Sequence, residues 1–174
     1  FWRLDSGALE AKNIILLSLV VIFAIIANLL VFYSLKWEKI GNLEPARVLE
    51  PLFVIILAII FSFFAEGLYE RNLKIIIPAL IASLALVFSH IRRHHLEFNP
   101  YFVAAIFGSF FFALELVISR LILDFYSPVS FYFIRSLLIF LISILIFKPN
   151  FKKLSTKVKW EILATGAIWV IYRV

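Results

Sequence analysis

The chain has 174 residues, of which 64% are hydrophobic, and its mean hydropathy is +1.04. Average soluble domains are only about 45–50% apolar, so a water-soluble fold of this length would have no place to bury so much apolar surface. The chain has no Cys, which excludes disulfides and thiolate chemistry. The net charge of +6 falls mostly between the apolar runs, where basic residues meet anionic lipid headgroups rather than nucleic acid. The predicted class is a polytopic membrane protein, with membrane lipids as its neighbours.

Five apolar runs have the length of about 20 residues that a helix needs to cross a bilayer, and a sixth run begins. Their uninterrupted apolar character excludes the alternating pattern of barrel strands, so the predicted fold class is an all-α transmembrane helical bundle. The linkers between the runs are short and charged, which predicts that consecutive helices run antiparallel to each other. The expected spans are 14–35, 43–64, 73–91, 100–122 and 128–147, followed by a partial span over 160–174.

The two ends of the chain bear on what the sequence represents. No Met occurs, not even at position 1, and the chain stops inside an apolar run that is too short to cross a bilayer. We therefore expect an internal part of a longer protein.

Small residues recur at helical spacing on the third expected span. Pro78, Ala82, Ala85 and Ser89 fall on one helix face, and such a face lets another helix approach closely. We interpret it as a packing surface in preference to a solute contact.

Several segments taken in order resemble a known family. The stretch "FYSLKW" is followed by "LEPLFVIILAIIFSFFAEGLYE", and later by "GSFFFALELVISRLILDFYSPVSFYFIRSLLIFLISILIF". This order resembles the junction between the two halves of an EamA-like protein, in the drug/metabolite transporter superfamily. The turn "EGLYER" departs from the usual acidic-then-basic pattern. The residues that carry the resemblance are Glu50, Pro51, Glu66, Arg120, Pro128 and Arg135.

The resemblance implies part of a ten-helix transporter with two inverted five-helix repeats. Residues 1–92 would be the C-terminal part of the first repeat, with three membrane helices. Residues 93–174 would be the N-terminal part of the second, with two helices and a partial third. The implied function is secondary transport of a small metabolite or drug-like solute across the cell membrane by alternating access. We expect no enzymatic activity and no cofactor, and we leave a homo-oligomer open.

The pair Glu50-Pro51 allows two interpretations. A carboxylate near a helix N-terminus is favoured by the helix dipole, so Glu50 has a simple end-of-helix explanation. If the helix begins near Pro45, as the resemblance implies, Pro51 lies inside it, removes one hydrogen bond and produces a kink. In transporters, interrupted helices line the solute site.

Counting along the spans places polar residues at matching depths. Asn28 lies seven residues before the end of its span and Glu50 seven after the start of the next, so both are expected roughly 10 Å inside the same membrane face. Glu115 and Arg135 are related in the same way to the opposite face. We predict a Glu115–Arg135 ion pair. The alternative is that both side chains extend to the interface.

Asn28, Glu50, Pro51, Glu115 and Arg135 are therefore the candidate residues of a solute cavity. His94-His95 with Glu97 is not expected to bind metal, because adjacent residues on a helix point to different sides. No phosphate-binding loop or nucleophile motif occurs, which favours a secondary transporter over a pump.

Two rival functions and the membrane orientation stay open. A structural or assembly subunit would use small-residue faces to bind partner helices. A lipid-acting membrane enzyme would need clustered acids, histidines or metal ligands at one depth. The family orientation places the N-terminus in the cytoplasm, whereas the distribution of basic residues favours the reverse.

Overall fold

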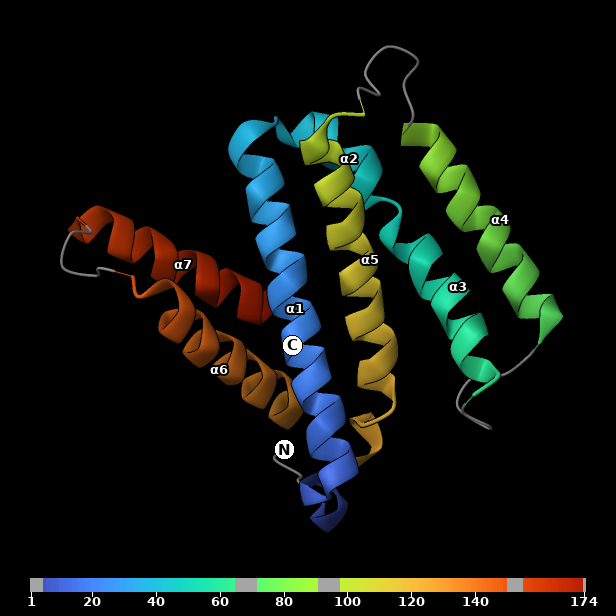
Figure 1. Cartoon of the computed structure of the whole chain (residues 1–174), viewed down its shortest axis with the longest axis horizontal. Coiled ribbons are helices and arrows are strands. Elements are labelled where there is room, and N and C mark those ends of the chain that lie inside the picture. Colours follow the sequence, from blue (N-terminus) through green and yellow to red (C-terminus); the bar gives the residue numbers. More distant parts are fainter. Residues whose placement is uncertain (1–4, 65–71, 91–97, 150–154, 174) are drawn as a thin grey trace.

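The computed structural model describes residues 5–64, 72–90, 98–149 and 155–173, and every element in these ranges is a helix (Figure 1). The predicted all-α class is therefore confirmed, and each expected span contains a helix. The elements are η1 (Ser6–Leu9), α1 (Ala11–Trp37), α2 (Ile40–Arg47), α3 (Glu50–Ser62), α4 (Leu73–His90), α5 (Pro100–Arg120), η2 (Leu123–Phe125), α6 (Pro128–Phe147) and α7 (Thr156–Arg173).

Helices α1 and α5 form the central pair and run antiparallel to each other (Figure 1). Their close approach depends on small residues. At Gly108 an added Cβ would lie 2.8 Å from the Val31 side chain and 3.4 Å from the Ala27 carbonyl oxygen. Small side chains therefore let the two backbones pack closely. The buried small residues of α5 are Ala104, Ala105, Gly108, Ser109, Ala113 and Ser119.

The remaining helices pack outward from this pair. Helix α3 packs against α5 and α4 packs against α3, whereas α6 packs against α1 (Figure 1). A buried cluster of Leu57, Ala113 and Val117 joins α3 to α5, and the Phe53 and Phe110 rings meet edge to face with their centroids 5.6 Å apart.

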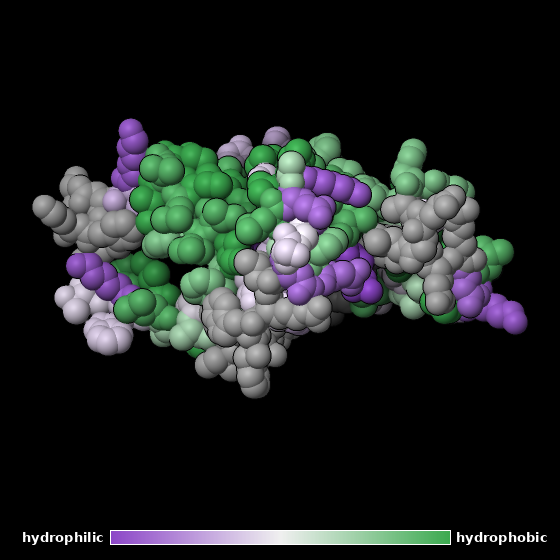
Figure 2. All heavy atoms as spheres, turned by 90° about the horizontal axis from the view of Figure 1, so that it is seen from below, coloured by the Kyte–Doolittle hydropathy of each residue, from purple (hydrophilic) through white to green (hydrophobic). Residues whose placement is uncertain are grey.

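Four helical segments of the described chain are long and apolar enough to cross a membrane. They are α1, the combined α2 and α3 over Ile40–Ser62, α5 and α6, while α4 is a shorter apolar helix. Apolar residues also cover much of the surface seen from the η1 and η2 end, with hydrophilic side chains gathered near its centre (Figure 2). These features indicate an integral membrane protein.

Local capping explains why the ends of α5 and α6 lie close to the expected ones. The Asn99 side chain accepts a hydrogen bond from the Phe102 amide at 2.8 Å, and Ser127 accepts one from the Ser130 amide at 3.2 Å. Each cap is followed by Pro at the first helical position, where its missing amide hydrogen costs nothing. Helix α6 ends at Phe147, and the following residue, Lys148, caps it with a left-handed φ of 43°.

The second expected span is not one continuous helix. Helix α2 ends at Arg47, Val48 and Leu49 form a turn, and α3 starts at Glu50. Pro51 therefore lies in the first turn of α3 and not inside a longer helix, so the predicted interruption is present but lies just before the proline. Because Pro has no amide hydrogen to donate, it is tolerated better in the first turn of a helix than in the helix interior.

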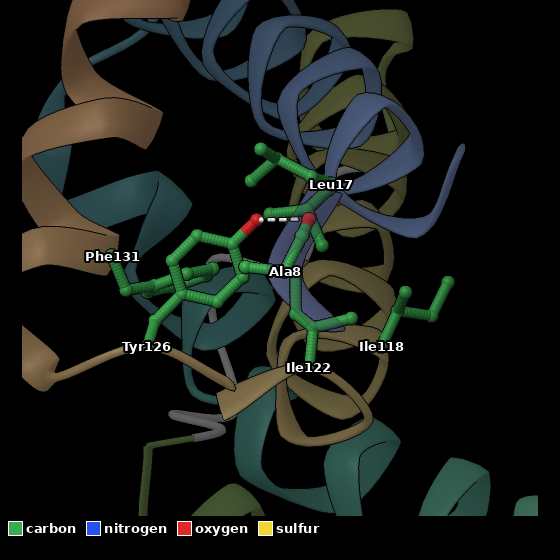
Figure 3. Packing of buried hydrophobic residues seen from close by; sticks show 7 residues of the cluster. Ala8, Leu17, Ile118, Ile122, Tyr126 and Phe131 are labelled. Atoms are coloured by element: carbon green, nitrogen blue, oxygen red, sulfur yellow. Dashed lines mark hydrogen bonds between the residues drawn. The ribbon is translucent and has the colours of Figure 1, made fainter. Parts of the chain in front are cut away.

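A short N-terminal helix covers the turn between α5 and α6. The Tyr126 hydroxyl donates a hydrogen bond of 3.2 Å to the Ala8 carbonyl oxygen, and the ring meets Phe131 (Figure 3). The Asp5 amide also donates to the Phe125 carbonyl oxygen at 3.1 Å. The Tyr126 side chain is buried and ties η1 to this turn.

Candidate functional site

Glu115 and Arg135 form an ion pair between α5 and α6. The Glu115 side chain is 5% exposed and the Arg135 side chain is 11% exposed. The predicted pairing is confirmed, and the alternative in which both groups extend to the interface is wrong, because neither charged side chain is open to the surface. The pair lies within two helices that are long enough to cross a membrane.

Local sequence fixes where these two side chains lie. Glu115 is itself buried in α5, as are Ile118 and Ser119 one turn further along, so this face of the helix points to the interior. On α6, Ile134 packs against the buried cluster that contains Phe131 and directs the neighbouring part of the helix toward α1 and α5. Apolar packing therefore excludes water from the pair, and a lower local dielectric strengthens the attraction between its charges.

The Arg135 guanidinium is not fully satisfied. Its Nε is buried and has no hydrogen-bond partner among the described residues. A guanidinium carries five N–H donors in a planar fork, and a buried donor without an acceptor is unfavourable and calls for an explanation. The pair therefore retains hydrogen-bonding capacity in the interior of the protein.

Asn28 has a local role within its own helix. Its Nδ2 donates to the Ala24 carbonyl oxygen at 2.7 Å, and the residue is only half-buried. Helix α5 packs against both α1, which carries Asn28, and α3, which begins with Glu50 (Figure 1).

Glu50 and Pro51 open α3. Glu50 is half-buried and takes part in an interaction of its own, and Pro51 is exposed. The position of Glu50 in the first turn agrees with the end-of-helix interpretation, in which the carboxylate meets the positive end of the helix dipole. The break before Pro51 agrees with the interrupted-helix interpretation, so both remain compatible with the fold.

A polar cluster at the opposite end of α5 was not anticipated from the sequence. Glu38 accepts hydrogen bonds from Asn99 at 2.6 Å and from Asn42 at 3.0 Å. The hydrogen bond from Asn42, the largest contribution, together with that from Asn99, lowers the pKa of the Glu38 carboxyl below its usual value. The spacing of Glu38 and Asn42 by four residues was the available signal. The hydrogen bond between Asn99 and Glu38 could not be predicted from the sequence, because it joins residues that only the fold brings together.

The four small residues predicted to form a packing surface on α4 are not buried by another part of the described chain, so this surface stays a prediction. On α4, Pro78, Ala82, Ala85 and Ser89 are exposed, whereas the contact with neighbouring helices buries Ser83 and Val87. Among the described helices, a close contact through small residues is made by α5 with α1. The spacing of four residues between its small side chains was visible in the sequence and would have predicted this face.

Metal binding receives no support from the described ranges. Within them, no group of three His, Cys, Asp or Glu residues could hold a metal ion. His94, His95 and Glu97 lie outside these ranges, as do Glu66 and the expected boundary between residues 92 and 93.

Comparison with protein-family models, with curated proteins and with solved structures gives no match to this chain.

Proposed function

We propose that the protein is a secondary transporter that moves a small metabolite or drug-like solute across the cell membrane by alternating access. The proposal includes the EamA-like, ten-helix inverted-repeat arrangement that the sequence resembles. It also assigns solute contact to the residues predicted for the cavity, which are Asn28, Glu50, Pro51, Glu115 and Arg135.

The observation that carries the proposal is the buried ion pair of Glu115 and Arg135. A lone charge at the centre of a membrane helix costs about 2.5–3.5 kcal/mol on insertion scales. Replacing a buried ion pair by apolar residues is often neutral or stabilising. Stability alone therefore gives little reason to keep two charges in these helices, and charged residues within membrane spans usually serve a pathway for a solute or an ion.

The interruption between α2 and α3 supports the same proposal. Val48 and Leu49 separate two helices within one membrane-length segment. Interrupted helices in transporters expose backbone groups that are tolerated where they line a cavity. The break lies between two helices that both pack against α5, the helix that carries Glu115.

A thermal-shift screen followed by flux measurements tests the proposal. The detergent-purified protein is heated with amino acids, nucleotide sugars, aromatic cations or lipids, because binding to the folded state raises the apparent melting temperature. Glu115→Gln and Arg135→Gln are expected to lose the response to the active solute class. That class is then expected to enter proteoliposomes. Stabilisation by lipid alone, with no flux of any class, would contradict transport.

The exposed small residues of α4 favour a second candidate, a structural or assembly subunit. A partner helix would pack against the face that contains Ala82 and Ala85. In that case Ala82→Leu would lower the oligomeric mass measured by light scattering, and no solute would change the melting temperature. An unchanged mass in Ala82→Leu would remove the support for this candidate.

A further inference from the structure

The buried Glu115–Arg135 pair contains one hydrogen-bond donor that has no acceptor among the described residues. Arg135 reaches Glu115 through Nη2, whereas its Nε is buried without an acceptor among the described residues. In a guanidinium, Nε and one Nη present parallel N–H bonds on the same edge, which suits an oxygen acceptor. The unused donor therefore identifies where a ligand oxygen would be stabilised.

The charges of the pair restrict what that ligand can be. Glu115 and Arg135 together sum to zero, and both are almost completely removed from solvent. An additional net charge beside them would lose its hydration without an opposite charge to compensate it. A neutral acceptor, such as an amide or ester carbonyl, meets the free donor without adding a charge.

The surroundings favour an apolar remainder of the ligand. Next to Glu115 on α5, Val117 and Ile118 are buried, and Ile134 and Leu138 of α6 pack against the same apolar cluster as Ile118. Apolar walls with a small number of placed polar groups are typical of small-molecule sites.

We infer that the Glu115–Arg135 site takes a neutral, largely apolar solute whose carbonyl oxygen accepts a hydrogen bond from Arg135 Nε. This inference rests on the proposed transport function for the route by which the solute arrives. Arg135 Nε is covered in this structure, so entry requires α6 to move relative to α5. Helix α6 packs mainly against α1, and it meets α5 through the ion pair and the apolar cluster around Ile118, so this motion would have to open both of these contacts.

A matched series of ligands tests the inference by equilibrium binding to the purified protein. At about pH 6, N-acetylphenylalaninamide is neutral, N-acetylphenylalanine is an anion and phenylalaninamide is a cation, while butylbenzene has no acceptor. The neutral amide is expected to bind tightest. Arg135→Lys keeps the positive charge but loses the guanidinium Nε, so it is expected to bind the amide at least ten-fold more weakly.

Arg120→Lys is the matched control, since Arg120 lies at the exposed end of α5 and its replacement is expected to leave the affinity unchanged. Tighter binding of either charged ligand, equal binding of butylbenzene, or an unaltered affinity in Arg135→Lys would overturn the inference. Failure of the whole series to bind would overturn it as well.

The flux panel described above separates this result from the proposed function. Flux of a charged solute together with failure of the neutral amide would leave transport standing and reject the inferred solute class. Binding of the neutral amide that depends on Arg135, without flux of any solute, would retain the site and reject transport.

Discussion

Glu115 in α5 and Arg135 in α6 lie twenty residues apart in the sequence and form a buried ion pair across the turn that joins their helices. Glu115 lies five residues before the end of α5 and Arg135 seven residues after the start of α6, which is between one and two helical turns in each case and brings the two side chains to a similar depth. The relationship places opposite charges inside two membrane-length helices. It is therefore the feature of this fold that hydrophobic burial alone least explains.

Removing one member of the pair is expected to destabilise the protein more than removing both. Glu115→Leu leaves the Arg135 charge buried without its partner, which costs about 3–5 kcal/mol. The double variant Glu115→Leu/Arg135→Leu buries no charge and is expected to unfold close to the temperature of the parent. Scanning fluorimetry in detergent measures all three proteins.

The exposed pair of Lys157 and Glu161 provides the control, with a separation of 4.0 Å and side chains 87% and 61% exposed. Lys157→Leu is expected to change the stability by less than about 1 kcal/mol. Equal destabilisation by the single and double variants at positions 115 and 135 would show that the two charges are not energetically coupled.

Gly108→Ala is expected to lower the melting temperature because the new Cβ would lie 2.8 Å from the Val31 side chain. Val is stiff about its first side-chain bond, so α1 and α5 would have to move apart. Overpacking of this kind costs about 1–3 kcal/mol.

Gly41→Ala is the matched control, because an added Cβ meets nothing within 4 Å there. Alanine at a helical position is favoured over glycine by about 0.5–1 kcal/mol, so this variant is expected to be as stable as the parent or more so. A similar melting temperature for both alanine variants would refute the tight α1–α5 contact.

Tyr126→Phe is expected to cost about 0.5–1.5 kcal/mol by removing the hydrogen bond to the buried Ala8 carbonyl. Burial raises the pKa of the Tyr126 hydroxyl. Because the folded pKa exceeds the unfolded value of about 10, this stabilising contribution is complete below pH 10 and is lost as the pH rises through the folded pKa.

Melting curves from pH 8 to 11 test this dependence, with Tyr33→Phe as the control because Tyr33 is exposed. The difference between the parent and Tyr126→Phe should shrink at the alkaline end. A constant difference across the range would exclude the titration of Tyr126 as its cause.

Glu38→Ala is expected to loosen the junction between α1, α2 and α5, since Glu38 accepts from both Asn42 and Asn99. The hydrogen bond from Asn42 is the main reason why the pKa of Glu38 is lowered. A lowered folded pKa means that the stabilisation is present above the unfolded pKa and is lost as the pH falls through the folded pKa.

The melting temperature of the parent should therefore approach that of Glu38→Ala on acidification, and the exposed Asp124→Ala variant serves as the control. A gap between the parent and Glu38→Ala that persists at pH 2–3 would contradict this assignment.

Helix positions were predictable because the apolar runs and the proline starts act locally. Pro100 and Pro128 mark the first residues of α5 and α6 as expected. The ion pair was predictable for a related reason, since a short turn between antiparallel helices fixes the relative depth of Glu115 and Arg135. Both inferences required only counting along the chain.

Contacts between distant helices were less predictable. Small residues occur on both α4 and α5, and only the fold shows that Gly108 packs against α1 while Ala82 is exposed. In the same way, only the fold shows that the Tyr126 hydroxyl donates a hydrogen bond to the Ala8 carbonyl oxygen. Such pairings depend on tertiary packing that no local pattern encodes.

The most direct test of the account compares flux with stability in the double variant Glu115→Leu/Arg135→Leu. Proteoliposomes with the parent are expected to take up at least one class of the solute panel. Those with the equally folded double variant are expected to take up none, because the pair is proposed to contact the solute and contributes little net stability. Uptake by the double variant at the rate of the parent would contradict the proposed role of the ion pair.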